Sequence, residues 1–524
     1  MESSIDIGTL NKFSFTYEGR RPEETTLYKV VSENFEKVVS SIENSGYGDG
    51  LPYYIKNEFK KFLDCGILEK GFLRVHCPQC NSNKLVAFSC KTRGICSVCG
   101  ARRMLDTSKH LVENVFPIGQ IRQWVISFPF QIRYILAYNK EMLNKLLAIF
   151  IRAVSTFYIA KAKKQKIKDP ETAAVTFIQR FGGSAANLNV HFHTLFMDGI
   201  FYVDKNGGTV FKNSVAPTND DVEKINKKIE KRFIRALKKK GFLEDYQEGG
   251  IQFNYENDNE LMAAARAASI NRKIGWGKNR GKRIERIGAF REVAWQPIKG
   301  ARVSYINGFS LHANVVIKEK ERKALEKLCR YTARPALANS RISEDEKGNI
   351  IYELKNSYTD GTTHLRLTKE DFIEKLIAII PPPRSNLVRY HGAFAPNSKT
   401  RKYVVPEKKN KKKSNNEDDF KNCLANQLKR KYWTPWADLL KKVFKIDALI
   451  CKKCGGRMSI VGEVTNPKII EKILSVLNLD HGKNDRESNN DSNIKIDITN
   501  SHVAISVVAI NSDFSENNSV DPPK

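Results

Sequence analysis

The chain has 524 residues, of which 41% are hydrophobic and 10% are aromatic, which excludes an intrinsically disordered protein and predicts two to four globular domains. Its 88 Lys and Arg residues outnumber its 58 Asp and Glu residues, for a formal net charge of +30. A cationic surplus of this size favours a polyanionic partner, above all nucleic acid, over a protein that is merely basic and soluble.

Targeting signals are not evident in the sequence. No apolar run approaches the roughly 18–20 residues that span a bilayer, and the first residues lack the charged-then-apolar pattern of a signal peptide. We therefore expect a cytoplasmic protein with no membrane partner. The ten cysteines are then expected to bind metal in a reducing compartment rather than to form disulfides.

In chain order, the first predicted elements are helices and a strand. Apolar residues at helical spacing predict two helices over 27–64. A buried strand is predicted over 121–130, ending at Pro129, and a largely apolar helix over about 140–160. Residues 219–240 predict a basic amphipathic helix, whose cationic face is either solvated or in contact with a DNA backbone.

Two CxxC pairs lie between these helices and the strand. They supply Cys77, Cys80, Cys96 and Cys99 with a fifteen-residue spacer, the pattern of a zinc ribbon that holds one structural Zn²⁺. Cys90 lies between the pairs and is surplus as a ligand. The ribbon either supports folding alone or recognises DNA ends, because cationic side chains flank it. These are Lys91, Arg93, Arg102 and Arg103.

A third CxxC pair, Cys451 and Cys454, supplies only half of a four-ligand site. No second pair follows it in the sequence. His481 and Cys423 are possible partners, although neither has a compelling spacing. A metal ion at this pair is therefore not favoured.

Two histidines separated by one residue, His191 and His193, lie in the predicted strand NLNVHFHTLFMDGIF. Because alternate side chains of a strand share a face, both imidazoles should point the same way and Phe192 into the core. Such a pair can hold one divalent cation, Mg²⁺ or Mn²⁺, although a strand that merely exposes two imidazoles has the same local sequence. Gln179, on the strand predicted at 173–182, is the candidate third ligand, and His312 is its rival.

Tyr331 lies on a predicted helix that Pro335 should end. Its local residues are equally typical of a packing tyrosine. Arg334 follows by one helical turn, which places its guanidinium beside the phenol. A phenol attacking a phosphodiester needs its developing charge offset, and Arg334 or Arg330 could do this.

A glycine-rich basic segment, NRKIGWGKNRGKRIER at 271–286, carries seven Lys or Arg residues around one tryptophan. An aromatic ring among cations and glycines suits contact with phosphates and an unstacked base. The candidate DNA contacts in it are Trp276, Lys278, Arg280, Lys282 and Arg283. Further on, Asp360-Gly361 predicts the turn of a β-hairpin, and the apolar-free run 407–419 predicts a linker.

The order of these motifs resembles the HUH-type rolling-circle transposases of the insertion sequence 91 family and its common-region relatives. The resemblance spans about 400 residues and includes VTFIQRFGGSAANLNVHFHTLFMDGIF, LCRYTARPALANSRI and NLVRYHGAFAPNSKTRKYVVP. It implies a zinc-binding domain, a nuclease with metal ligands His191 and His193, and a nucleophile, Tyr331, that leaves a 5′-phosphotyrosine and a free 3′-hydroxyl. Lys327 and Pro335 occupy the places of a second tyrosine, so the single-tyrosine branch is expected.

The expected fold is α+β and multidomain. It comprises a helical region (1–70), a four-cysteine zinc ribbon (71–115), an HUH nuclease domain with a central antiparallel sheet flanked by helices (116–400), a basic linker (401–420), a small CxxC module (421–480) and a largely flexible tail (481–524). The expected partner is single-stranded DNA at element termini and targets. No Walker motif occurs in the sequence, so a host helicase should unwind the DNA. The alternatives are a plasmid rolling-circle replication initiator and a non-catalytic zinc-dependent DNA-binding protein.

Overall fold

The computed structural model describes residues 3–4, 15–16, 21–44, 50–182, 187–245, 251–253, 259–289, 300–358, 360–406, 449–476 and 504–505. They fall into two compact units. Unit 1 comprises residues 1–22, 64–89 and 440–524, and unit 2 comprises residues 23–63 and 90–439. These units do not follow the predicted domain boundaries, because both the 1–70 region and the 71–115 ribbon are divided between them.

Unit 2 is built on a seven-stranded sheet in the order β13-β14-β5-β7-β6-β19, with β15 also paired to β5. All of its strand pairs are antiparallel, which confirms the predicted central antiparallel sheet. Both β14 and β15 pair with β5. The strands are β5 (Ile121–Ser127), β6 (Ala173–Phe181), β7 (Leu188–Met197), β13 (Val303–Ile306), β14 (Phe309–His312), β15 (Val316–Ile317) and β19 (Val388–Gly392).

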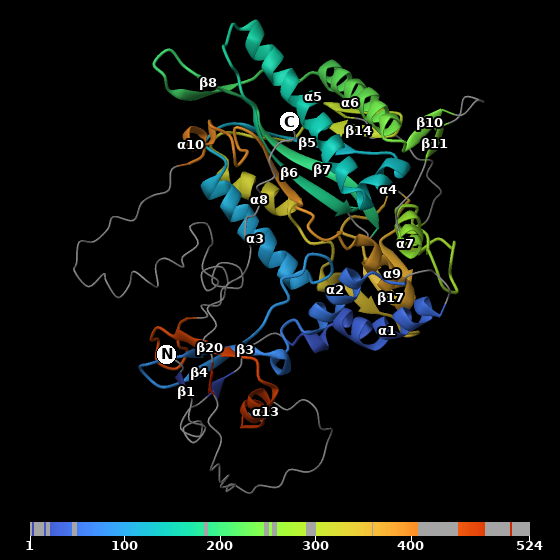
Figure 1. The fold of residues 1–524 in the computed structure, drawn as a ribbon, viewed down its shortest axis with the longest axis vertical. Helices are drawn as coiled ribbons and strands as arrows, with labels where there is room; N and C mark the ends of the chain where they lie inside the picture. The colour runs from blue at the N-terminus through green and yellow to red at the C-terminus, as the bar shows by residue number, and fades with distance from the viewer. Residues whose placement is uncertain are drawn as a thin grey trace, which may run out of the picture. The chain divides into compact units, whose positions relative to one another are not determined.

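Helices cover both faces of this sheet (Figure 1). Side chains that alternate along β5 and β7, such as Trp124 and Phe192, form one core with α4 (Phe130–Tyr138), α5 (Lys140–Lys164) and α6 (Asn219–Lys239). The opposite face, including Leu195, forms a second core with α3 (Ser97–Asn114) and α8 (Arg322–Thr332). The period-2 pattern of the strands thus separates the two cores.

Among the described residues, α5 is one helix with the length and apolar composition of a membrane span, and Arg152 interrupts its apolar residues. Nine of its side chains, including Leu146 and Phe150, are buried in the core beneath the sheet. An apolar helix packed in this way has the pattern of a buried core helix.

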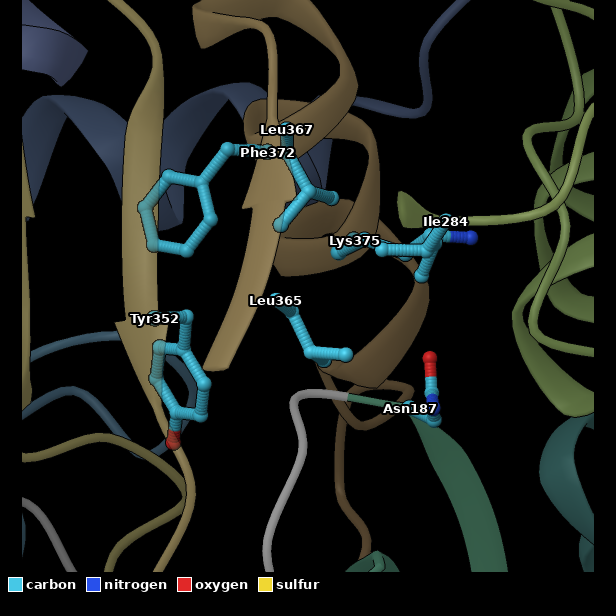
Figure 2. A pocket seen from close by; sticks show the side chains of 7 residues that line it. All are labelled: Asn187, Ile284, Tyr352, Leu365, Leu367, Phe372 and Lys375. Atoms are coloured by element: carbon cyan, nitrogen blue, oxygen red, sulfur yellow. The ribbon is translucent and has the colours of Figure 1, made fainter. Parts of the chain in front are cut away.

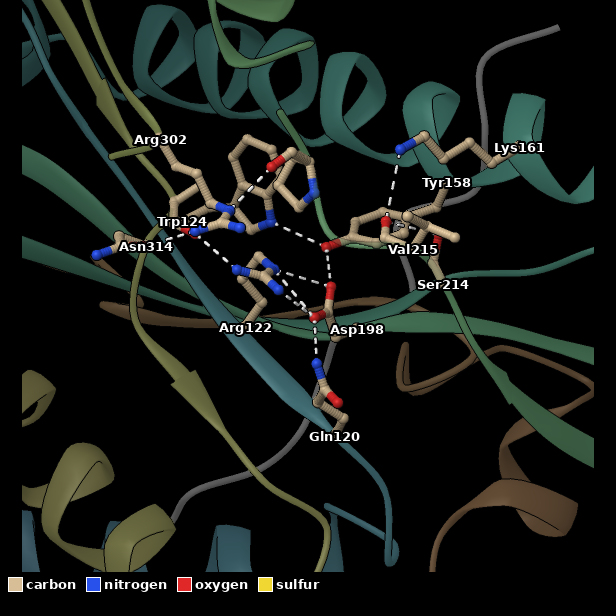
Figure 3. Close-up of polar contacts among 12 residues, drawn as sticks. Gln120, Arg122, Trp124, Tyr158, Lys161, Asp198, Ser214, Val215, Arg302 and Asn314 are labelled. Atoms are coloured by element: carbon tan, nitrogen blue, oxygen red, sulfur yellow. Dashed lines mark hydrogen bonds and ion pairs between the residues drawn. The ribbon is translucent and has the colours of Figure 1, made fainter. Parts of the chain in front are cut away.

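A buried ion pair fixes the end of β7 (Figure 3). The Asp198 carboxylate is fully buried and accepts hydrogen bonds from the Arg122 guanidinium (2.7 and 3.0 Å), Gln120 Nε2 (2.8 Å) and Tyr158 Oη (2.8 Å). The chain bends at Asp198, and a hairpin of β8 (Gly199–Val203) and β9 (Thr209–Asn213) follows.

A second sheet in unit 2 has the antiparallel order β12-β18-β17-β16. Its strands are β12 (Glu285–Ile287), β16 (Ile342–Glu344), β17 (Ile350–Glu353) and β18 (His364–Leu367). Strands β17 and β18 confirm the predicted hairpin. Four helices lie in this part of the unit: α1 (Thr26–Glu43), α2 (Tyr53–Leu63), α7 (Glu260–Ile270) and α9 (Lys369–Ile379).

Helix α1 contacts α9 and β16, which is why the N-terminal helices belong to unit 2 rather than to a separate region. A small, mostly apolar pocket lies beside this sheet, with Lys375 and Asn187 as its polar lining residues (Figure 2).

Unit 1 contains a four-stranded sheet in the order β2-β4-β3-β20, and β20 joins it from more than 370 residues downstream. Strands β3 (Phe72–His76) and β4 (Asn83–Ala87) form a hairpin, and β20 (Ser459–Val464) pairs antiparallel with β3. Helix α13 (Pro467–Val476) packs its apolar side chains against this sheet. The other elements of unit 1 are β1 (Ser3–Ser4), β2 (Phe15–Thr16), β21 (Ala504–Ile505) and the 3₁₀ helix η3 (Leu68–Lys70).

The remaining described elements are short: η2 (Pro22–Glu24), η4 (Asn339–Arg341), α10 (Arg401–Val404), β10 (Leu243–Asp245) and β11 (Ile251–Phe253). The predicted linker at 407–419 lies outside the described residues, as do Cys423 and His481.

Candidate active site

His191 and His193 lie side by side on one face of β7, with ring centroids 4.9 Å apart. Phe192 between them is fully buried in the opposite core, as the strand alternation predicted. The pair lies on the face that α3 and α8 cover. A rigid strand in the middle of the sheet therefore holds both imidazoles in place.

Both imidazoles are set up to be neutral ligands. His191 Nδ1 lies 2.8 Å from the Asn189 carbonyl, which can only accept, so Nδ1 carries the proton and Nε2 keeps a free lone pair. Burial, together with the nearby cation of Arg334, lowers the pKa of His191 to about 4 and the pKa of His193 well below its usual value. A donor set of two neutral imidazoles fits a divalent metal ion.

Gln123, on β5, is a part of this site that the sequence analysis missed. Its buried side-chain Nε2 lies 2.8 Å from His193 Nδ1, and rotation of the amide by 180° would place its oxygen there instead. His193 can present Nε2 to a metal only if Nδ1 carries the proton, which requires the amide oxygen of Gln123 to face it. In the sequence, Gln123 is a polar residue among the apolar residues of a predicted strand. That pattern does not show that its side chain contacts His193.

Gln179 lies directly opposite His191 in the pairing of β6 with β7. Its Nε2 donates to the Thr332 carbonyl (2.8 Å) and lies 3.5 Å from that of Tyr331, so its side-chain oxygen is the atom left for a metal. His312, on β14, is half-buried two strands away from His193. Among the described residues, no third His, Cys, Asp or Glu donor joins the histidine pair within 4.8 Å.

Tyr331 stands on the last turn of α8, facing the histidine pair. Its ring centroid lies 5.9 Å from that of His193, and 42% of the residue is exposed. Helix α8 ends at Thr332, as Pro335 predicted. The hydrogen bonds of Gln179 to the end of α8 tie the tyrosine helix to the histidine sheet.

Two cations lie against the Tyr331 ring. Arg334 Cζ is 4.8 Å and Lys355 Nζ 5.3 Å from its centroid. Arg330, the alternative, instead pairs with Glu326 one turn earlier on α8. Lys355 comes from the connection between β17 and β18 and carried no signal in the sequence. An exposed phenol between cations, next to two neutral imidazoles, suits attack on a phosphodiester.

Comparison with protein families identifies the chain. A transposase family model, Y2_Tnp, matches residues 173–402, and the IS91 transposase zinc-binding domain model matches residues 34–128. The chain belongs to the insertion sequence 91 family of transposases. No curated protein and no solved structure matches it. The first match contains the histidine pair, Tyr331 and the basic segment.

The cysteines of this transposase group differently from the predicted ribbon. Cys77 and Cys80 lie with Cys451 and Cys454 in unit 1, whereas Cys96 and Cys99 belong to a group that includes Cys90 in unit 2. The prediction that Cys77, Cys80, Cys96 and Cys99 share one ion is therefore wrong. The reason is that β20 pairs with β3 and brings the third CxxC pair to the first. The zinc-binding family match and both cysteine groups support structural Zn²⁺.

The cysteine-bearing helix α3 of the transposase packs directly on the tyrosine helix α8. A Cβ atom at Gly100 would lie 2.6 Å from that of Pro335, so only glycine permits this approach. The Arg322 guanidinium, on α8, donates to the carbonyls of Val112, Phe116 and Pro117 at the end of α3. The cysteine-bearing segment therefore supports the helix that carries Tyr331.

The basic segment of the transposase is an anchored loop. The buried Glu374 carboxylate accepts from the backbone N–H groups of Gly275 (2.7 Å) and Trp276 (3.2 Å). Trp276 is only 8% exposed, so the prediction that its ring stacks on a DNA base is wrong. The other four candidate contacts are exposed: Lys278, Arg280, Lys282 and Arg283.

The candidate DNA contacts near the cysteines differ in the exposure and in the hydrogen bonds of their side chains. Arg103 donates to the carbonyls of Lys91 (2.6 Å) and Thr92 (3.1 Å), which stabilises the loop before α3. Arg93 is exposed and donates to the Ser385 carbonyl. Arg102 is half-buried, and burial lowers its pKa.

Proposed function

We propose that this transposase nicks and rejoins single-stranded DNA at the termini of its element through a 5′-phosphotyrosine intermediate. The observation that carries the proposal is the placement of an exposed phenol, Tyr331, against the histidine pair on the central sheet.

The proposed reaction exchanges one phosphodiester for another. Tyr331 Oη attacks the scissile phosphorus and loses its proton as the P–Oη bond forms. The P–O3′ bond breaks, and the leaving 3′ oxygen takes up a proton to become a hydroxyl. Rejoining is the reverse, with an incoming 3′-hydroxyl attacking the phosphotyrosine. Arg334 and Lys355 lie where their charges stabilise the phenolate and the five-coordinate phosphorus.

His191 and His193 would hold the divalent cation, Mg²⁺ or Mn²⁺, with the side-chain oxygen of Gln179 as the proposed third ligand. The cation, when bound, polarises the scissile phosphate. Gln123 would keep the tautomer of His193 that leaves Nε2 free.

The proposed mechanism uses one tyrosine. The positions one turn away from Tyr331 are Lys327, on α8, and Pro335, beyond the end of that helix. The second strand transfer would therefore use a 3′-hydroxyl attacking the tyrosyl-linked DNA, or the tyrosine of a second protomer. Unwinding of the DNA would fall to a host helicase.

The test is capture of the covalent intermediate. Wild-type protein is incubated with Mn²⁺ or Mg²⁺ and a single-stranded oligonucleotide from an element terminus, labelled at its 3′ end. The label should appear on the protein in a denaturing gel, and EDTA or the double substitution His191→Ala/His193→Ala should abolish it. A protein that stays unlabelled with termini from both ends of the element would refute the proposal, as would labelling that survives EDTA.

We also propose that the loop anchored by Glu374 contacts the DNA backbone. Each phosphate contact to a single strand contributes about 0.7 to the slope of log affinity against log salt concentration. Removing the four exposed cations of the loop should therefore reduce the magnitude of this slope by about 3. Fluorescence anisotropy with a labelled oligonucleotide at several salt concentrations measures this slope. The substitutions are Lys278→Ala, Arg280→Ala, Lys282→Ala and Arg283→Ala together.

The matched control removes four exposed lysines from α6 instead, whose cationic face is the alternative contact surface. If the loop variant kept the wild-type slope and the α6 variant had a flattened slope, the contact with the DNA backbone would be assigned to α6 instead of the loop. The control substitutions are Lys224→Ala, Lys227→Ala, Lys231→Ala and Lys239→Ala.

A further inference from the structure

Four thiols converge in unit 1 from the two ends of the chain. Cys77 and Cys80 follow β3, and Cys451 and Cys454 precede β20. Cys77 Sγ lies 3.5 Å from Cys454 Sγ, and Cys80 Sγ lies 3.5 Å from Cys451 Sγ. All four sulfur atoms lie within 4.8 Å of one another, and all four cysteines are free. Four thiolates at this spacing match the ligand set of a tetrahedral zinc ion.

The two loops that carry these thiols have the same backbone hydrogen bonds. In one loop, Cys77 N donates to the Ser82 carbonyl (2.9 Å) and Asn81 N to the Cys77 carbonyl (2.9 Å). In the other, Cys451 N donates to the Gly456 carbonyl (2.9 Å) and Gly455 N to the Cys451 carbonyl (2.8 Å). The repeated pattern makes the loops equivalent halves of one site.

The residue after the second cysteine has positive φ in both loops, +58° at Asn81 and +73° at Gly455. Asparagine and glycine are the residue types that adopt this conformation most readily. Each loop can therefore fold back and present both of its thiols on the same side.

The surrounding structure holds the two loops together. Strand β20 pairs antiparallel with β3, with Ser459 opposite His76, so the loops extend from the same end of the strand pair. The Ser82 hydroxyl lies 3.0 Å from the sulfur atoms of both Cys80 and Cys451 and can donate to either thiolate. Hydrogen bonds of this kind, outside the ligand set, orient metal ligands.

We propose that Cys77, Cys80, Cys451 and Cys454 bind a zinc ion of their own, in addition to the zinc of the matched family domain. The family match ends at residue 128, so it does not include Cys451 or Cys454. This ion would join two segments more than 370 residues apart in the sequence and make unit 1 depend on both. The proposal is independent of the nuclease activity.

Zinc content of the purified full-length chain, measured by inductively coupled plasma mass spectrometry, tests the proposal. Cys451→Ser/Cys454→Ser should contain one zinc ion fewer per chain than wild type. Cys77→Ser/Cys80→Ser should lose the same single ion, and the four substitutions together should still lose only one. Lys453→Ser, in the same loop, is the matched control and should keep the wild-type content.

A fifth variant separates this site from a ribbon of the first two CxxC pairs. This variant replaces Cys77, Cys80, Cys96 and Cys99 with serine. If the chain has two separate zinc sites, it should lose two zinc ions. If these four cysteines share one ion in a ribbon, it should lose only one. Wild-type zinc content in Cys451→Ser/Cys454→Ser would overturn the proposal.

Since serine variants can misfold, Cys454→His gives a second test that keeps four ligands. It should retain the ion, and after Co²⁺ substitution its absorption spectrum should change from that of a tetrathiolate site to that of a site with three thiolates and one imidazole. An unchanged Co²⁺ spectrum would show that Cys454 is not a ligand and would also overturn the proposal.

Discussion

Tyr331→Phe is expected to lower formation of the covalent protein–DNA adduct by at least about 1000-fold, because the substitution removes the attacking oxygen and leaves nothing in its place. Tyr331 is the one aromatic ring on α8 that faces the histidine pair, and its exposure leaves room for a strand of DNA. The ring of phenylalanine keeps the packing against Arg334 and Lys355. The 3′-labelled oligonucleotide described above measures the effect, since the label stays with the protein.

Tyr403→Phe provides the matched control, because Tyr403 is also exposed and also lies in unit 2. It should form adduct at the wild-type rate. DNA binding by Tyr331→Phe should be unchanged, which separates loss of chemistry from loss of affinity. If Tyr331→Phe still became labelled at a rate near that of wild type, another nucleophile would be responsible and the assignment of Tyr331 would fail.

The histidine pair shows what the sequence could predict. Alternation along one strand is a local property, so His191, Phe192 and His193 could be assigned to their faces without knowing any neighbour. The end of α8 could also be predicted from neighbouring residues alone, because Pro335 cannot continue a helix. The placement of Gln179 opposite His191 followed from two strands adjacent in the sequence, which pair in most antiparallel sheets.

The errors concern partners that are distant in the sequence. A CxxC pair shows that two thiols converge but does not identify the other two ligands, so Cys77 and Cys80 were assigned to the nearest pair rather than to one joined through β20. Trp276 was placed on the surface because its neighbours in the sequence are cationic. The ring is buried, and Glu374, almost 100 residues later, binds the backbone N–H of this residue; no local pattern encodes that contact.

The pairing of α3 with α8 connects the two family matches physically. Cys96 begins α3 and Cys99 lies in its first turn, while Arg322 of α8 caps its far end. Gly100 and Pro335 meet where α3 passes the end of α8. A metal ion held at Cys96 and Cys99 would therefore stiffen the surface on which α8 rests, and the position of Tyr331 would depend on it.

Asp198→Asn is expected to lower the free energy of unfolding of unit 2 by about 3–5 kcal/mol, the usual cost of removing one partner of a buried ion pair. The amide carries no charge to balance Arg122, which is itself buried. It also offers one acceptor oxygen where the carboxylate offers two. Burial, together with the Asp198 carboxylate, raises the pKa of Tyr158 well above its usual value, so its hydroxyl stays a donor that needs an acceptor.

Guanidinium chloride unfolding followed by circular dichroism measures this loss, and Asp220→Asn is the matched control. Asp220 pairs with Lys224 on the surface of α6, where both side chains are more than three-quarters exposed, so its loss should cost less than about 1 kcal/mol. Replacing both buried partners, Arg122→Met with Asp198→Leu, should restore part of the stability because no charge is then left unpaired. If Asp198→Asn unfolded like wild type, the network would not hold the end of β7, and the rigidity of the histidine strand would need another source.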